Sequence, residues 1–111
     1  MKIITPESMK AAYEFIRRVS FSGLKLPSSK RIQFKARRLK MLHGYYLYPD
    51  NIIVINAETP DISRMLQIMA HEMVHVALEQ NASCDHDQHD EHFRALADVI
   101  EDEMGWQRGS I

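Results

Sequence analysis

The first part of the chain has the hydrophobic pattern of an amphipathic helix. In residues 5–19 the apolar positions are three or four residues apart, the spacing that places side chains on one face of a helix. These positions are Met9, Ala12, Tyr13, Ile16 and Val19. Thr5 is a suitable N-cap, and Pro6 suits the first helical turn. We therefore predict a helix over residues 5–19 that packs on a core through this face.

The middle of the chain changes to the patterns of β-strands. Residues 32–37 alternate apolar and polar side chains, as expected for a strand with one buried face. Residues 45–48 and 52–55 are two further runs rich in aromatic and β-branched residues. The Pro49-Asp50-Asn51 between them suits a turn. These patterns predict a hairpin within a small antiparallel sheet of three strands.

Two more helices are predicted after the strands. Thr59-Pro60-Asp61 has the residues of a helix start, and the apolar positions over 62–78 occupy more than one face, so this helix should be largely buried. The polar and acidic segment 81–88 separates it from a third helix, whose apolar positions begin at Phe93 and which ends near Gly105. The sequence thus predicts an α+β fold with an N-terminal helix, a three-stranded sheet and two further helices.

Length and composition favour a single domain over residues 1–111. A second independent core would need roughly another 100 residues. The only cysteine is Cys84, so no internal disulfide can form, and a reducing compartment fits best. The apolar N-terminal run is interrupted at Thr5 and Pro6, and there is no stretch of about 20 apolar residues. We expect a cytoplasmic protein with no membrane span, and its oligomeric state is not indicated.

Charge is unevenly distributed along the chain. Residues 1–40 hold eleven of the fourteen Lys and Arg residues, whereas thirteen of the fifteen acidic residues lie from position 50 onward. Clustered cations can bind the phosphates of DNA without sequence preference. The candidates are Lys30, Arg31, Lys35, Arg37, Arg38 and Lys40. A solubilising strand face without a partner explains the same pattern equally well.

The segment His71-Glu72-Met73-Val74-His75 has the spacing of a helical metal site. Histidines four residues apart on a helix project from the same face one turn apart, and neutral imidazole suits zinc. A catalytic zinc site needs three protein ligands and a fourth position for water. Glu72 is placed to take a proton from that water as general base. Two histidines packed in the core are the alternative, but that arrangement leaves Glu72 buried at a cost.

A third ligand is expected farther along the chain. The candidates are His86, His89 and His92 together with Glu91, Glu101 and Glu103. His89 ranks first because it precedes Phe93 by four residues and shares its helix face. His92 is the second choice, whereas His86 falls in the acidic segment. The position six after His75 is Asn81, which disfavours a metzincin.

The stretch from Tyr45 to Ile100 resembles the SprT-like family, which has the metalloprotease fold of the Spartan DNA–protein crosslink proteases. The resemblance rests on a hairpin ending in Ile-Ile-Val-Ile-Asn, the His-Glu-Met-Val-His helix, and a His-x-x-x-Phe element at residues 89–93. It implies zinc binding by His71, His75 and His89 and catalysis by Glu72. Family members often have glycine before the third histidine and Gly-Pro after it. This chain has neither, so His92 stays the alternative third ligand.

The expected function is that of a zinc-dependent metalloprotease that hydrolyses peptide bonds with zinc-activated water. By the resemblance, its substrates include proteins bound or crosslinked to DNA. One alternative is a non-catalytic, zinc-stabilised module that binds nucleic acid. Another is a regulatory zincin that cleaves a repressor and uses an acidic third ligand, Glu91 or Glu101. A metal-dependent nuclease is disfavoured because Glu72 lies in a peptidase-type motif.

Overall fold

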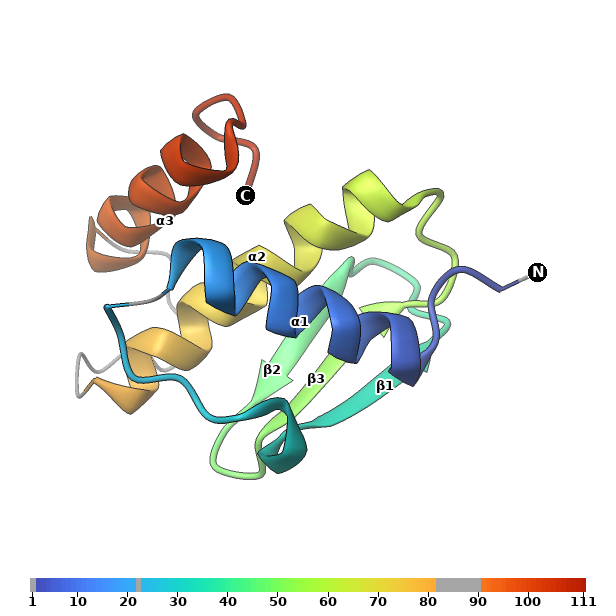
Figure 1. Cartoon of the computed structure of the whole chain (residues 1–111). Helices are drawn as coiled ribbons and strands as arrows, with labels where there is room; N and C mark the ends of the chain where they lie inside the picture. The colour runs from blue at the N-terminus through green and yellow to red at the C-terminus, as the bar shows by residue number, and fades with distance from the viewer. Residues whose placement is uncertain (1, 22, 82–90) are drawn as a thin grey trace.

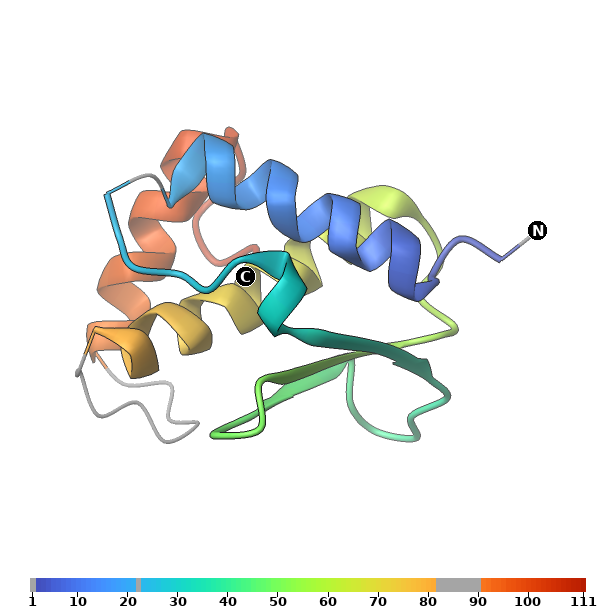
Figure 2. The same ribbon diagram turned by 60° about the horizontal axis from the view of Figure 1, so that its bottom comes forward.

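The computed structural model of the chain describes residues 2–21, 23–81 and 91–111. Within these ranges the elements follow one another in the predicted order (Figure 1). They are α1 (Pro6–Ser20), a 3-10 helix (Ser29–Arg31), β1 (Gln33–Arg37), β2 (Gly44–Leu47), β3 (Ile52–Asn56), α2 (Ile62–Gln80) and α3 (Glu91–Met104). Helices α1 and α2 lie side by side over one face of the sheet, and α3 packs against both (Figures 1 and 2). The predicted α+β fold is confirmed.

Helix α1 begins at a reciprocal cap. The Thr5 hydroxyl accepts a 3.1 Å hydrogen bond from the Ser8 amide, and the Ser8 hydroxyl accepts one of 3.0 Å from the Thr5 amide. The prediction of Val19 as a packing residue was wrong, because its side chain is 43% exposed and Ser20 is buried instead. Successive helix residues are 100° apart around the helix axis, so Ser20 points closer than Val19 to the direction of the buried Ile16. Ser20 therefore continues the buried face of the helix.

The sheet is mixed, with strand order β1-β3-β2. Strands β2 and β3 pair antiparallel, with Tyr46 opposite Ile53, as the predicted hairpin requires. Strand β1 pairs parallel with β3, with Phe34 opposite Ile53, so the prediction of an entirely antiparallel sheet was wrong. Strand β3 is a continuous apolar run, as expected for a central strand with a neighbour on each side. Strand β1 alternates polar and apolar residues, as expected for a strand at the edge of the sheet.

Helix α2 is the central element of the fold. The Asp61 side chain caps it by accepting a 2.8 Å hydrogen bond from the Arg64 amide. The helix packs against α1, α3, β2 and β3, so most of its surface is covered, as predicted. Its buried methionines, Met65, Met69 and Met73, join the main hydrophobic core cluster. A helix held on several sides is a rigid support for side chains that must keep a fixed geometry.

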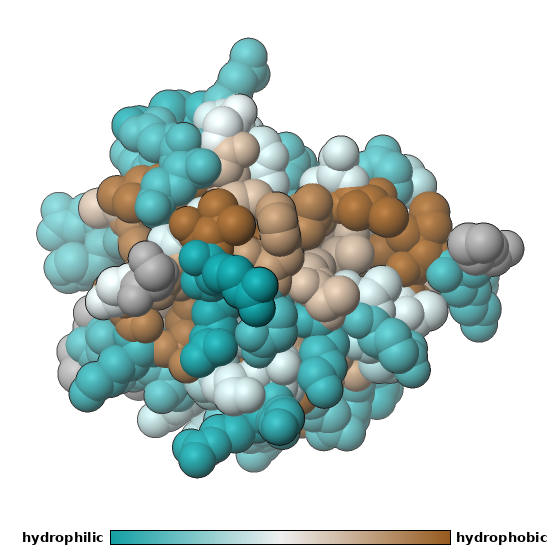
Figure 3. All heavy atoms as spheres, viewed as in Figure 1, coloured by the Kyte–Doolittle hydropathy of each residue, from teal (hydrophilic) through white to brown (hydrophobic). Residues whose placement is uncertain are grey.

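Part of the apolar surface remains open to solvent. On the face seen in Figure 3, apolar side chains gather in a band that crosses the molecule between polar regions. On α1, Phe15 is 52% exposed.

No helix within residues 2–21, 23–81 and 91–111 is both long and apolar enough to cross a membrane.

Candidate active site

The two histidines of the motif lie next to each other on α2. The ring centroids of His71 and His75 are 5.2 Å apart, with 68° between the ring planes. His75 is 1% exposed and Glu72 is 4% exposed, whereas His71 is half-buried. The arrangement therefore joins two imidazoles and a carboxylate at the boundary between the core and the surface.

Phe93 of α3 packs against both imidazoles. Its ring centroid is 4.9 Å from that of His71 and 4.8 Å from that of His75. Phe93 is itself 3% exposed, so its ring is fixed in the core. The contact restricts the orientations of both imidazoles. It also gives the phenylalanine of the His-x-x-x-Phe element a structural role, since this side chain brings the start of α3 to the histidine pair.

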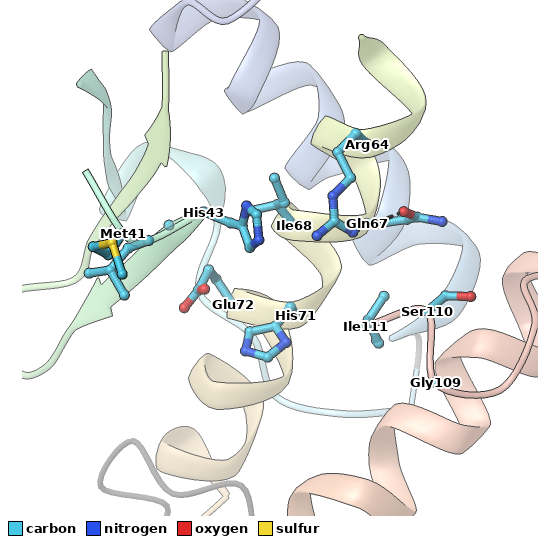
Figure 4. A pocket seen from close by; sticks show the side chains of 12 residues that line it. Met41, His43, Arg64, Gln67, Ile68, His71, Glu72, Gly109, Ser110 and Ile111 are labelled. Carbon is cyan, nitrogen blue, oxygen red and sulfur yellow. Dashed lines mark hydrogen bonds between the residues drawn. The ribbon is translucent and has the colours of Figure 1, made fainter. Parts of the chain in front are cut away.

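A cavity of about 390 Å³ opens beside the motif. Its floor is α2, including His71 and Glu72, and its two walls are residues 41–44 and residues 109–111 (Figure 4). Figure 4 shows His43 on one side of His71 and Ile111 on the other. The half-buried imidazole and the buried carboxylate therefore both face a space that can admit a ligand.

Gly44 allows the first wall to lie close to α2. A Cβ atom at this position would be 2.6 Å from the Val54 carbonyl oxygen and 3.1 Å from the Ile68 Cγ2 atom. Such distances are too short for any other residue without movement of the strand. The absence of a side chain at residue 44 thus lets the start of β2 lie this close to the backbone of β3 and to Ile68 of α2.

The second wall is held by a buried carboxylate. Glu101 of α3 has no exposed surface, and it accepts hydrogen bonds of 2.7 Å from Arg94 and 2.9 Å from the Ile111 amide. Burial raises the pKa of the Glu101 carboxyl, but backbone hydrogen bonds from Ile111 and Gly109 and the contact with Arg94 together hold the pKa below its ordinary value. Glu101 is therefore a charged anchor for residues 109–111.

The third metal ligand expected from the sequence cannot be placed. His89 and His86 lie outside the described residues. His92 is in the first turn of α3 with an exposed side chain, and Glu101 is engaged by Arg94 and Ile111. Among the described residues, no three metal-ligating side chains are grouped closely enough to hold an ion. His89 and His92 thus remain the predicted first and second choices.

The basic residues follow one edge of the sheet. Lys30 and Arg31 belong to the 3-10 helix, and Lys35 and Arg37 alternate on β1 with the residues that face the core. Lys40 is exposed in the connection to β2. Arg38 instead forms a 2.7 Å ion pair with Glu58, which reduces its availability for phosphate. Strand β1 is the edge opposite β2, so most of these cations lie away from the cleft floor.

Several cleft residues were not singled out from the sequence. Arg64 and Gln67 line the floor, and residues 41–43 and 109–111 form the walls. A signal for Arg64 was present, because it precedes His71 by seven residues, or two helical turns on the same face. Nothing in the local pattern of residues 109–111 indicates that they reach the motif.

Two solved structures with a similar fold are metallopeptidase zymogens. The chain superposes on that of Methanocaldococcus jannaschii jannalysin with a TM-score of 0.56 and 14% identity, covering 83% of this chain and 74% of the other. For Pyrococcus abyssi abylysin the TM-score is 0.55 and the identity 15%, covering 89% and 97%. No protein of curated function matches in sequence. The SprT-like family model matches residues 9–109, and the chain therefore belongs to the SprT-like family.

Proposed function

We propose that this chain is a zinc metallopeptidase that hydrolyses peptide bonds in protein substrates. The observation that carries the proposal is the buried Glu72 beside the adjacent imidazoles of His71 and His75, at the floor of an open cleft. Membership of the SprT-like family and the fold shared with metallopeptidase zymogens support it.

The side chains at the motif have the chemistry that a zinc site requires. Two imidazoles one helical turn apart suit a single zinc ion, with His89 as the proposed third ligand and His92 as the alternative. When bound, zinc would supply a Lewis acid that polarises the substrate carbonyl and lowers the pKa of a water to near neutral pH. Glu72 then takes the proton of the attacking water and delivers it to the leaving amine.

The edge strand β2 provides a means of holding the substrate. In the part of the chain that the structure describes, it pairs with β3 on one side only, and its first residue, Gly44, lines the cleft. An extended peptide can add to such an edge through backbone hydrogen bonds. Because those bonds do not depend on side chains, β2 would present different peptide sequences to Glu72.

The basic edge supports proteins bound or crosslinked to DNA as one class of substrate. Lys30, Arg31, Lys35 and Arg37 form no ion pair with any described carboxylate, and their charges are available for phosphates. Strands β1 and β2 are separated by β3, so their axes are roughly 10 Å apart. DNA along β1 would then leave the cleft beside β2 open to an attached protein.

Replacement of Glu72 by glutamine tests this function. We expect Glu72→Gln to retain zinc and lose turnover by at least about 100-fold, because the amide has a similar shape but cannot accept the proton. Turnover is measured with unfolded casein and with a quenched fluorescent peptide, before and after removal of metal by a chelator. Glu7→Gln, an exposed position on α1, is the matched control. Unchanged hydrolysis by Glu72→Gln would refute the proposed mechanism, and zinc binding without hydrolysis by the wild type would favour a non-catalytic module.

A further inference from the structure

Arg64 places a positive charge in the cleft. It belongs to α2 and lines the same cavity as His71 and Glu72. Its Nη1 atom donates a 3.2 Å hydrogen bond to the Gln67 side-chain oxygen. Figure 4 shows the guanidinium beside Gln67 and Ile68, at the end of the cleft nearer the start of α2. The side chain thus adds a charged group to the floor that carries the motif.

Within the described part of the chain, the Arg64 guanidinium forms no ion pair. Among the described residues, its one side-chain partner is the neutral Gln67, whose oxygen accepts from it. Arg94 and Arg108, which follow it in the chain, pair at 2.7 Å with Glu101 and Asp102. A guanidinium has five N–H donors, so most of those of Arg64 remain for a ligand. Because the residue is half-buried, an anion bound there is partly shielded from water.

The distance between Arg64 and the motif corresponds to a few residues of an extended peptide. Seven residues along an α-helix correspond to about 10.5 Å between Arg64 and His71. An extended peptide rises about 3.3 Å per residue, so this distance corresponds to about three residues of a substrate. A peptide whose cleaved bond lies at His71 and Glu72 can therefore place a side chain at Arg64.

We propose that Arg64 is a specificity-determining residue, which binds an acidic side chain of the substrate about three residues from the cleaved bond. The ligand is a carboxylate, which a guanidinium binds through two parallel hydrogen bonds. Gln67 is the positioning residue, because its side-chain oxygen holds one nitrogen of Arg64. The inference rests on the proposed peptidase function and adds a substrate class to it, namely proteins with an acidic residue near the cleaved bond.

Peptides that differ at one position test the inference. Quenched fluorescent peptides carry Glu, Gln or Lys three residues from the cleaved bond, placed on either side of it in separate series. In one series we expect wild type to cleave the Glu peptide about tenfold more efficiently than the Gln peptide, mainly through a lower KM. Arg64→Ala should abolish this preference, and Arg64→Glu should transfer it to the Lys peptide. Arg18→Ala, an exposed position on α1, is the matched control and should behave as wild type.

Several results would overturn the inference. A preference for Glu that survives in Arg64→Ala would show that another group binds the carboxylate. An equal loss in Arg18→Ala would show that overall charge, rather than the cleft, sets the preference. If Arg64→Ala weakens binding of single-stranded DNA while the peptide preference is unchanged, Arg64 contacts phosphate instead.

A binding measurement separates failure of this inference from failure of the proposed function. The same peptides are titrated into the Glu72→Gln variant, with and without Arg64→Ala, and followed by fluorescence anisotropy. Tighter binding of the Glu peptide that depends on Arg64 supports the inference even if wild type hydrolyses no peptide, whereas equal binding of the Glu and Gln peptides overturns it. Absence of hydrolysis by wild type counts against the peptidase proposal alone.

Discussion

Arg94 and Glu101 form a 2.7 Å hydrogen-bonded ion pair within α3, two turns apart, and the carboxylate has no exposed surface. The second oxygen of Glu101 accepts from the Ile111 amide at 2.9 Å. Since residues 109–111 are one wall of the cleft, this pair connects the stability of α3 to the shape of the candidate active site. The wall should move when the carboxylate is removed.

Loss of the Glu101 charge should destabilise the fold. We expect Glu101→Gln to lower the free energy of unfolding by about 1–3 kcal/mol, because the charged hydrogen bonds to Arg94 and Ile111 are weakened in a buried site. Urea unfolding at pH 7 measures the change. Asp102→Asn removes a charge from the exposed pair with Arg108 and should have a much smaller effect. Equal effects of the two substitutions would contradict the anchoring role of Glu101.

The effect of Glu101 should also depend on pH. The pKa of Glu101 is lower in the folded chain than in the unfolded chain. Its contribution to the free energy of unfolding is therefore present above the unfolded pKa of about 4.3. The contribution is lost as the pH falls through the lower folded pKa. The difference in unfolding free energy between wild type and Glu101→Gln should therefore shrink as the pH is lowered from 7 to 3. A difference that stays constant over this range would show that the charge of Glu101 is not responsible.

Gly44→Ala should disturb the wall formed by residues 41–44. The added Cβ would lie 2.6 Å from the Val54 carbonyl oxygen, so β2 must shift away from its neighbours. We expect a loss of about 1–3 kcal/mol in unfolding free energy, together with slower peptide hydrolysis. Gly23→Ala is the matched control, because a Cβ there meets no atom of the described residues within 4 Å. If the two variants are equally stable and equally active, the close approach at Gly44 is unimportant.

Charge reversal on β1 tests the proposed DNA contact. We expect Lys35→Glu with Arg37→Glu to weaken binding of single-stranded DNA and to reduce the slope of log affinity against log salt by about 1.4, since two phosphate contacts are removed. Filter binding over a range of salt concentrations provides both values. The same double reversal at Lys10 and Arg18, which are exposed on α1, is the control. An unaltered affinity at low salt would support a solubilising role for the basic edge.

Local features of the fold were predictable because neighbouring residues determine them. The caps at Thr5 and Asp61 hydrogen-bond to amides three residues away, and the β2–β3 hairpin needs only a short turn. The four-residue spacing of His71 and His75 likewise predicted that they lie next to each other on one face of a helix. Each of these features is specified within a few residues of sequence.

Features that depend on distant contacts were not predictable in the same way. The parallel pairing of β1 with β3 skips the intervening β2, and alternation in residues 32–37 fits either strand direction. The wall at residues 109–111 reaches the motif only because Glu101 holds it there. Arg64 was predictable as a member of the motif's helix face, but its access to the cleft depends on both walls.

Zinc content tests the central claim of this account most directly. Elemental analysis is performed on purified wild type and on His71→Ala, His89→Ala and His92→Ala after supplementation with zinc. We predict one tightly held zinc per chain in wild type, lost in His71→Ala and His89→Ala and retained in His92→Ala. Loss in His92→Ala with retention in His89→Ala would exchange the roles of these two residues. Absence of stoichiometric zinc in the wild type would contradict the account and leave His71 and His75 as packing residues.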